Sequence, residues 1–355
     1  MVQGYTVCSK QGRVENMQVF ITGASGLLGN HLITALQERG DTIRALVLPN
    51  EDATALEARG VTVFRGDIRQ PETLKAPLQG TDTVFHLAGM MGVWLPMADY
   101  YAVNVLGTEN VCRAALEAGV RRIIHISSWT VYGMDLGMPA HEEFGFAPFQ
   151  EPYAVTKAAG DRLVQRMIVR EKLPAVIIRP GTFFGPGDRL HFSRMADRVR
   201  NGTGIIVGSG RNALPFVYVT DVVQGLMLAT EVPDAVGQAY NITNDQPLTQ
   251  EEFLRGIAED IGAGTPKIHV PYQALYAAAY AAERISAARH SQKQPVVTRL
   301  GVKLFGTDNR HSVDRARREL GYEPRMSLRD GIREAAYWYL KQHQQVASTA
   351  IKVAA

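Results

Sequence analysis

Two residues of one predicted helix carry the clearest chemistry in this sequence. Tyr153 and Lys157 lie four positions apart, a spacing that places both side chains on one helix face. Pro152 precedes them where a first-turn proline is favoured, so Tyr153 falls near the positive end of the helix dipole. The dipole and the Lys157 ammonium group both favour the phenolate, and we therefore expect the pKa of Tyr153 to be lowered from about 10. Such a tyrosine can act as a general acid or base close to neutral pH.

A pair of serines offers the hydroxyl group that this tyrosine would work with. Ser127 and Ser128 stand at the end of the predicted strand 122–127. Ligands of open parallel sheets bind at this carboxyl edge, where a serine can hydrogen-bond to a carbonyl or alcohol oxygen while Tyr153 moves the proton. Consecutive side chains of a strand point to opposite faces, so only one of the two serines can do this.

A glycine-rich turn joins the first predicted strand, 17–22, to the first predicted helix. Gly23, Gly26 and Gly29 give the spacing G-x-x-G-x-x-G. Glycines there permit a tight turn, close approach of the backbone to a pyrophosphate, and packing of the helix on the strand. The helix N-terminus adds free N–H groups and its positive dipole end. We therefore predict a dinucleotide cofactor, NAD or NADP, at this turn.

The end of the second predicted strand bears on the choice between NAD and NADP. An acid there would accept the ribose hydroxyls, and an arginine would bind a 2′-phosphate. The residues 46–49 are Leu-Val-Leu-Pro, which supply neither group, and the missing acid favours NADP. Glu51 and Asp52 follow closely, so NAD stays open. Asp67, after the third strand, can hydrogen-bond the adenine amine or cap the local turn.

Short apolar runs alternate with amphipathic, helix-length segments from Met17 onward. This alternation predicts an α/β fold with a Rossmann-type, doubly wound parallel sheet of about seven strands and a smaller C-terminal substrate-binding lobe. The expected strands are 17–22, 42–47, 61–65, 83–88, 122–127, 175–179 and 238–242. The expected divisions are a flexible extension 1–16, an NAD(P)-binding domain 17–185 to which 215–243 returns, a substrate lobe from 186–214 and 244–345, and a tail 346–355.

Composition excludes several classes of function. The 355 residues carry 38 Lys+Arg against 35 Asp+Glu, and a net charge of +3 argues against nucleic-acid partners and against an anionic membrane surface. The two cysteines fit a reducing compartment, and no apolar run approaches the ~18 residues of an integral membrane helix. We expect a cytoplasmic protein with a small-molecule substrate and no metal site. His86 and His125, in apolar strands, are interpreted as core histidines.

Further motifs recur in a fixed order along the chain. They are Asp67, His86-Leu87-Ala88-Gly89, Asn104-Val-Leu-Gly-Thr, Ser127-Ser128-Trp-Thr-Val-Tyr-Gly and Arg179-Pro180. Together with the glycine turn and Tyr153-x-x-x-Lys157, they make the whole chain from Met17 resemble the extended short-chain dehydrogenase/reductases.

The resemblance implies a role for each matched position. It selects Ser128 over Ser127 as catalytic, makes Tyr153 the general acid/base, and lets Lys157 hold the nicotinamide ribose and lower the tyrosine pKa. Asn104 is implied to support the site, and the helices starting near Asn104 and Tyr153 to pair in a homodimer. The implied cofactor-binding residues are Gly23, Ser25, Gly26, Leu27, Gly29, Asp67, Ile68, Leu87, Ala88, Gly89, Tyr153, Lys157, Pro180 and Thr182.

Departures from subfamily patterns narrow the reaction. Sugar-nucleotide dehydratases place Asp-Glu directly after the catalytic hydroxyl, where this chain has Trp129 and Thr130, so that dehydration is not expected. Nucleotide-sugar epimerases carry a diphosphate-binding arginine where this chain has Leu214. Arg211, three residues upstream, could substitute, and an epimerase with tightly bound NAD stays the alternative.

The remaining motifs look like the 3β-hydroxysteroid dehydrogenase and dihydroflavonol-reductase branch. They are 183–188, the Ala-rich segment 272–288 and 312–324. We predict an NAD(P)-dependent oxidoreductase that interconverts a secondary alcohol and a ketone on a largely apolar small molecule. A dinucleotide-sensing regulator would not need a tuned acid. Side chains that would line the substrate site, or else fill the core, are Met90, Met91, Trp94, Trp129, Phe183 and Phe184.

Overall fold

A parallel sheet of seven strands forms the centre of the computed structural model, which describes residues 16–354 except 93, 290 and 292. All strand pairs of this sheet are parallel. The predicted Rossmann-type sheet is therefore confirmed. Its strands are β1 (Gln18–Thr22), β2 (Thr42–Val47), β3 (Thr62–Arg65), β4 (Thr83–His86), β5 (Arg122–Ile126), β6 (Ala175–Pro180) and β10 (Ala239–Ile242).

The strand order, β10-β6-β5-β4-β1-β2-β3, places the first strand inside the sheet. The chain winds outward from β1 in one direction through β2 and β3, and then in the other direction from β4 to β10. Ligands of such sheets bind outside the carboxyl ends of the strands, beside the point where the winding reverses. That point lies between β1 and β4, where Thr22 pairs with His86.

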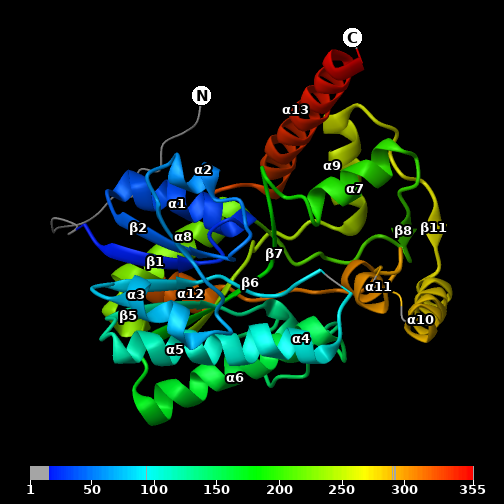
Figure 1. Cartoon of the computed structure of the whole chain (residues 1–355). Coiled ribbons are helices and arrows are strands. Elements are labelled where there is room, and N and C mark those ends of the chain that lie inside the picture. Colours follow the sequence, from blue (N-terminus) through cyan, green and yellow to red (C-terminus); the bar gives the residue numbers. More distant parts are fainter. Residues whose placement is uncertain (1–15, 93, 290, 292, 355) are drawn as a thin grey trace.

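Helices cover both faces of the sheet (Figure 1). Helices α1 (Leu27–Arg39) and α8 (Val219–Glu231) contact each other on one face, and α5 (Thr108–Glu117) and α6 (Pro152–Glu171) on the other. The apolar core is divided in the same way. Val19 and Ile21 pack with the α1 and α8 side chains, whereas Phe20 between them packs with those of α5 and α6. Burial on both faces explains the continuous apolar runs of the strands.

Short helical segments fill the connections between these elements. One of them, η2 (Ala102–Gly107), is a π-helical turn that leads from α4 (Met97–Tyr101) into α5. Turns of this type are frequent at functional sites. The others are α2 (Thr54–Glu57), η1 (Pro71–Leu74), α3 (Lys75–Leu78), η3 (Trp129–Tyr132) and η4 (Pro233–Ala235).

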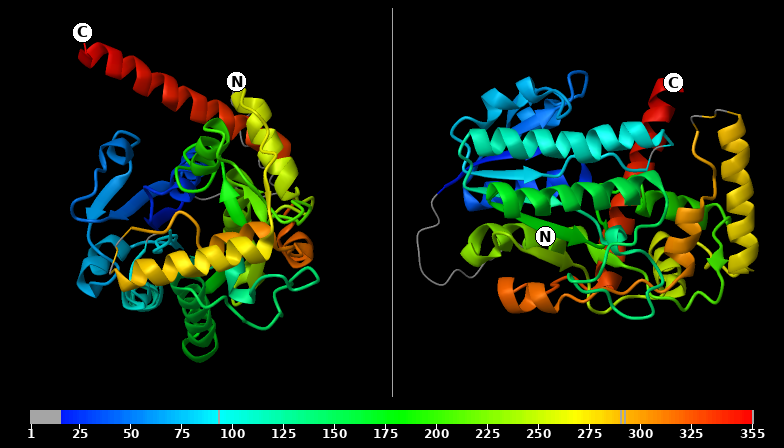
Figure 2. Two further views of the ribbon diagram at one scale, coloured as in Figure 1. Left: turned by 90° about the vertical axis from the view of Figure 1, so that its right-hand side faces the viewer. Right: turned by 90° about the horizontal axis from the view of Figure 1, so that it is seen from below.

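The remaining elements build the smaller lobe, with α10 at its outer end in the right-hand view of Figure 2. Its strands form two parallel pairs, β7 (Thr182–Phe184) with β9 (Phe216–Tyr218) and β8 (Ile206–Val207) with β11 (His269–Val270). Its helices are α7 (Phe192–Arg200), α9 (Gln250–Ile261), α10 (Tyr272–Ala288) and α11 (Arg299–Gly306).

Three segments differ from the expected divisions. The segment 215–243 returns to the sheet through α8 and β10, but its first strand, β9, pairs with β7 outside the sheet. Helix α12 (Asp314–Leu320), expected in the lobe, packs on β10 and α8. Helix α13 (Leu328–Ala354) continues through most of the expected tail. Residues 1–15 of the expected extension lie outside the described residues.

Candidate active site

The predicted site residues come together along one edge of the sheet. The glycine turn follows β1, Asp67 and Ile68 follow β3, and Leu87 to Gly89 follow β4. Ser128 follows β5, and Pro180 ends β6. Because all seven strands are parallel, these positions share the carboxyl edge, although they are more than 150 residues apart in the sequence.

The glycine turn has the shape that a pyrophosphate requires. Gly23 adopts a φ of +75°, and a Cβ atom there would lie 2.8 Å from the amide nitrogen of Ala88. A Cβ atom on Gly29 would lie 2.5 Å from the Gly23 carbonyl oxygen, so only glycine lets α1 pack this closely. Helix α1 begins after Gly26 with no side-chain cap and no acid in its first turn. Its N–H groups and positive dipole end are therefore available to a phosphate, and the turn fits a dinucleotide.

The His86 ring connects Thr22, which directly precedes the glycine turn, to Thr108 of α5. Its Nδ1 lies 2.8 Å from Thr22 Oγ1, and its Nε2 lies 3.0 Å from Thr108 Oγ1. Burial lowers the pKa of His86 to about 3, and its ring stacks on that of His125 at 5.4 Å. The interpretation as a satisfied core histidine is confirmed for His86. His125 is buried as expected, but its Nδ1 has no hydrogen-bond partner among the described residues.

Asp67 is engaged within its own turn. Its carboxylate accepts hydrogen bonds from the Arg69 backbone at 2.9 Å and forms an ion pair with the Arg69 guanidinium at 2.5 Å. These hydrogen bonds hold the pKa of Asp67 below its usual value. Of the two hypotheses for Asp67, the structure therefore supports the second, in which Asp67 caps its local turn.

Ser128 lies beside the hydroxyl group of Tyr153. Its Oγ accepts hydrogen bonds from the backbone N–H of Thr130 at 3.2 Å and from Thr130 Oγ1 at 2.9 Å. The Ser128 side chain also interacts with the Tyr153 hydroxyl and lowers its pKa, although burial outweighs this effect. With two donors from Thr130, the Ser128 proton is directed toward Tyr153 or a substrate oxygen.

Tyr153 lies in the first turn of helix α6, whose N-cap is Glu151. The Glu151 carboxylate accepts hydrogen bonds from the backbone N–H groups of Tyr153 at 3.1 Å and Ala154 at 3.3 Å. Burial raises the pKa of Tyr153 to about 12, against the hydrogen bond with Ser128, which lowers it. The expected lowering of this pKa is therefore wrong. Glu151, which was not among the predicted site residues, directly precedes the first-turn Pro152, and its charge opposes the phenolate.

Lys157 is buried one helical turn beyond Tyr153. Its Nζ donates a hydrogen bond to the Ile126 carbonyl oxygen, at the end of β5. Burial lowers the pKa of Lys157 to about 8, while Asp161 opposes the shift. A Cβ atom on Gly89 would lie 3.8 Å from the Lys157 Nζ. The lysine therefore lies between the end of β5 and the loop after β4.

Asn104 fixes the loop after β4 to α6. Its Oδ1 accepts a hydrogen bond from the Met90 backbone at 2.7 Å, and its Nδ2 donates to the Met90 carbonyl at 3.1 Å and to Thr156 Oγ1 at 3.0 Å. A Cβ atom on Gly160 would lie 2.5 Å from the Asn104 carbonyl oxygen, so η2 and α6 are in close contact. Asn104 thus fixes the positions of both elements.

The expected substrate-lining side chains divide between the core and the loop before α4, and none of them lines either of the two cavities described below. Phe184 is fully buried, stacks on Phe192 and contacts Phe253 edge to face, and Phe183 packs against the same core. Trp129 is buried and donates a hydrogen bond from Nε1 to Thr182 Oγ1 at 3.1 Å. Met90, Met91 and Trp94 are partly buried in the loop before α4.

A cavity of about 480 Å³ opens in the lobe next to Thr182. It is built by elements of the expected substrate lobe, namely α7, α9, α10, α11 and the segment 294–298, but by none of the six side chains that were expected to line the substrate site. Most of its wall is apolar. The apolar side chains include Leu190, Met195, Phe216, Leu275, Val297 and Phe305.

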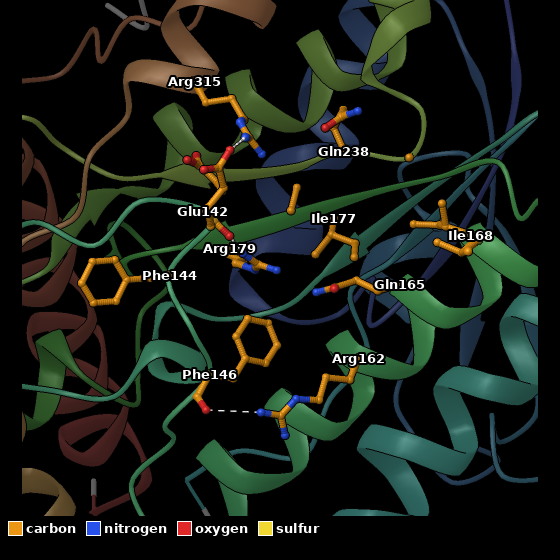
Figure 3. A pocket seen from close by; sticks show the side chains of 14 residues that line it. Glu142, Phe144, Phe146, Arg162, Gln165, Ile168, Ile177, Arg179, Gln238 and Arg315 are labelled. Atoms are coloured by element: carbon orange, nitrogen blue, oxygen red, sulfur yellow. Dashed lines mark hydrogen bonds and ion pairs between the residues drawn. The ribbon is translucent and has the colours of Figure 1, made fainter.

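A second cavity, of about 580 Å³, lies beside α6 and the edge strand β10 (Figure 3). Arg179 lies in it, and its guanidinium forms a buried ion pair with Asp161 at 2.9 Å. Arg162 donates a hydrogen bond to the Phe146 carbonyl oxygen at 3.2 Å. None of the predicted catalytic or cofactor-binding residues lines this cavity.

Comparisons with known proteins agree with this architecture. The model of the NAD dependent epimerase/dehydratase family matches residues 19–243. A 2-alkyl-3-oxoalkanoate reductase of Stenotrophomonas maltophilia is 31% identical over 89% of this chain and 98% of its own length. A 3 beta-hydroxysteroid dehydrogenase/Delta 5-->4-isomerase of Mycobacterium tuberculosis is 30% identical over 94% of this chain and 93% of its own length.

Solved structures agree as well. The crystal structure of gox2253 has a TM-score of 0.77 at 30% identity and covers 92% of this chain and 99% of its own. MoeE5 in complex with UDP-glucose and NAD has a TM-score of 0.72 at 28% identity, again over 92% and 99%.

The chain belongs to the NAD-dependent epimerase/dehydratase family and has the fold of the extended short-chain dehydrogenase/reductases. It is accordingly an enzyme that depends on a nicotinamide dinucleotide, NAD or NADP. Over the described residues, no helix has the length and apolarity needed to cross a membrane. Within the same residues, no group of histidine, cysteine and acidic side chains could hold a metal ion.

Proposed function

We propose that this protein is an NAD(P)-dependent oxidoreductase that interconverts a secondary alcohol and a ketone on a largely apolar molecule. The observation that carries the proposal is the placement of Ser128, which favours the Tyr153 phenolate, together with Tyr153 and Lys157 at the sheet edge where the glycine turn lies. The bound cofactor would supply or accept the hydride. The protein's own residues orient the substrate oxygen and move the proton.

Each proposed role follows from the contacts of the side chain. Tyr153 gives its proton to the ketone oxygen during reduction and takes it back during oxidation. Ser128, held by Thr130, donates a hydrogen bond to the same oxygen. Lys157 supplies a positive charge beside the cofactor ribose, and Asn104 is a positioning residue that fixes the loop after β4 to α6.

The apolar cavity supports a substrate with an apolar body. It reaches Thr182, which accepts the hydrogen bond from Trp129, and Trp129 directly follows Ser128. A ketone at Ser128 could therefore extend into the cavity, whose apolar wall suits an apolar group. The names of relatives are consistent with this class, since they include an oxoalkanoate reductase and a hydroxysteroid dehydrogenase.

NADP is the proposed cofactor, with Arg65 as the cation at its 2′-phosphate. Arg65 ends β3 and pairs with Val47 at the end of β2, and its guanidinium donates hydrogen bonds to the Pro49 and Glu51 carbonyl oxygens. The Glu51 carboxylate accepts a hydrogen bond from the Leu48 backbone at 3.0 Å. The acid is thus engaged in its own turn, while an arginine lies beside the end of β2.

The alternative epimerase would need a cation at the sugar-nucleotide diphosphate. Leu214 is buried in the core with Phe216, and the exposed Arg211 does not line the lobe cavity. These positions favour the dehydrogenase proposal over the epimerase. The expected homodimer would bury Leu106 and Val169, which are 47% and 70% exposed on η2 and α6. The homodimer and the cytoplasmic location stay predictions.

A cofactor-oxidation assay tests the proposal. Purified protein is mixed with NADPH or NADH and a panel of aryl, alicyclic and steroidal ketones, and the absorbance of the reduced nicotinamide is followed. Ketone-dependent loss of absorbance is expected, faster with NADPH. No loss with either cofactor, together with turnover of a sugar nucleotide, would support the epimerase instead.

A further inference from the structure

The lobe cavity has a charged face as well as an apolar wall. His191, Arg194, Met195 and Arg198 recur at helical spacing along α7 and its N-cap, and all four line the cavity. Both arginines are exposed to solvent at this face. The described residues that line the cavity include no aspartate or glutamate. The cavity therefore combines an apolar interior with two positive charges.

The two arginines differ from others in the same part of the molecule, which form ion pairs with carboxylates. Arg299, on the neighbouring α11, forms an ion pair with Glu283 at 2.5 Å. Neither Arg194 nor Arg198 has a carboxylate within 4.0 Å in the described part of the chain, and Arg198 donates only to the Val296 carbonyl oxygen, at 2.9 Å. That hydrogen bond ties the guanidinium to the segment 294–298. Both guanidinium groups retain donors for a ligand.

The acids nearest to this face are occupied elsewhere. Asp197 of α7 accepts a hydrogen bond from the Tyr339 hydroxyl at 2.7 Å and faces His343 of α13 at 3.5 Å. The Asp188 carboxylate accepts hydrogen bonds from the backbone N–H groups of Leu190, His191 and Phe192. Asp188 thus caps the start of α7 and leaves the arginine charges uncompensated.

The cavity has an inner and an outer end. Thr182 marks the inner end, because it is bound to Trp129 beside the proposed catalytic serine. Val296, which is 84% exposed, marks the outer end together with the two exposed arginines. A bound substrate would therefore have its reacting carbon inside and meet the positive charges at the opposite end.

We propose that the substrate is an anionic amphiphile, an apolar ketone or alcohol with a carboxylate that Arg194 and Arg198 bind at the outer end of the cavity. Paired guanidinium groups are suited to a carboxylate because their N–H donors match its two oxygens. The location of the ketone depends on the proposed function. The recognition of the anion can be measured without any turnover.

Calorimetric titration of the full chain tests this proposal with decanoate and its neutral counterpart, methyl decanoate. Decanoate is expected to bind about tenfold more tightly than the ester, the scale of one charge-assisted hydrogen bond. The double variant Arg194→Gln/Arg198→Gln should lose this difference and retain the affinity for the ester. Arg200→Gln, which removes one positive charge from α7 outside the cavity, should bind both ligands as the unmodified protein does.

Additional variants and ligands distinguish the loss of anion recognition from misfolding and from failure of the proposed function. Arg194→Lys should retain part of the preference, and retained ester binding shows that a variant is folded. Equal affinity for acid and ester, an unchanged preference in the double variant, or no binding of either ligand overturns the proposal. Displacement of decanoate by a lower concentration of UDP-glucose also overturns it, since the arginines would then serve a diphosphate. Decanoate binding without any ketone reduction would contradict only the proposed function.

Discussion

Ser127 and Ser128 are consecutive residues at the end of β5, and their hydroxyl groups bind different partners. Ser127 Oγ donates a 2.5 Å hydrogen bond to Asp161, which is buried and paired with Arg179. Ser128 Oγ is held by Thr130 and lies beside the Tyr153 hydroxyl. Because consecutive side chains of a strand point to opposite faces, Ser127 contacts Asp161 of α6, whereas Ser128 lies in the proposed site.

Replacement of each serine by alanine should therefore have a different effect. Ser128→Ala removes a donor to the substrate oxygen, and we expect kcat to fall about 100-fold with little change in stability. Ser127→Ala removes a buried hydrogen bond to a charged group, and we expect about 1.5–3 kcal/mol of lost stability with kcat nearly unchanged. Steady-state kinetics and urea unfolding of both variants test the assignment, and the reverse pattern would refute it.

The proton donor is tested by Tyr153→Phe. This change keeps the ring and removes only the hydroxyl group, so we expect kcat for ketone reduction to fall by about 10²–10⁴-fold. The dissociation constant of NADPH, measured by fluorescence, should change little, because the backbone of the glycine turn is untouched. A Tyr153→Phe protein with most of its turnover would rule out the role of this residue.

The pH dependence of reduction should follow Lys157. Its pKa of about 8 means that the ammonium form dominates at neutral pH and is lost above pH 8. We expect kcat/KM for reduction to be flat below about pH 7.5 and to decline above pH 8, whereas Tyr153, with a pKa of about 12, stays protonated. A profile that stays flat to pH 10 would contradict this role.

The same shift predicts the direction of the stability change. The folded pKa of Lys157, about 8, lies below its ordinary value of 10.5, so the unfolded chain binds more protons between these pH values. Burial of the ammonium group therefore destabilises the fold at pH 7, and its contribution improves as pH rises from 8 to 10.5. Lys157→Met should be inactive but at least as stable at pH 7 by urea unfolding. A large loss of stability would show that the Lys157 hydrogen bond outweighs the cost of burial.

The buried ion pair of Asp161 and Arg179 lies next to the site, because Asp161 binds Ser127, which directly precedes Ser128. Its side chains are 0% and 2% exposed, and removal of one partner leaves an uncompensated buried charge. We expect Asp161→Asn to lower the free energy of unfolding by about 3–5 kcal/mol. Glu109→Gln is the matched control, because it breaks an exposed pair on α5 and should cost less than about 0.5 kcal/mol. Equal effects of the two changes would contradict this account.

The proposed cofactor preference depends on Arg65. Arg65→Gln should weaken NADPH binding by about tenfold, through the loss of a charge-assisted hydrogen bond, and leave NADH binding unchanged. Lys75→Gln, which removes a charge from α3, serves as the control. The dissociation constants of NADPH and NADH are measured for both variants. An equal loss of affinity for NADH in Arg65→Gln would refute the proposal that Arg65 binds the 2′-phosphate.

Much of the fold was predictable because it depends on local signals. The alternation of apolar runs and amphipathic helices predicted all seven strands of the sheet, and the glycine spacing located its dinucleotide turn. The position of Arg65 was not predicted, since it depends on which strand lies beside β2. The raised pKa of Tyr153 was missed because burial, which the sequence does not display, outweighs the helix dipole.

The residues that line the lobe cavity could not be predicted either, because they come from elements that are far apart in the sequence. Its wall combines Thr182, Gln250 and Phe305, which no local period connects. Phe184 illustrates the converse case. It directly follows the proposed site in the sequence, but β7 orients its side chain into an aromatic core with Phe216 and Phe253. Proximity in sequence therefore did not predict contact with the cavity.

Transfer of deuterium from labelled cofactor tests the central claim most directly. The protein is incubated with an apolar ketone and NADPH carrying deuterium at C4, in the R and the S form separately, and the product is analysed by mass spectrometry. One form should yield an alcohol with one deuterium on the carbinol carbon, with one NADP formed per alcohol. An unlabelled product, or inversion of a sugar nucleotide without net cofactor oxidation, would contradict the account.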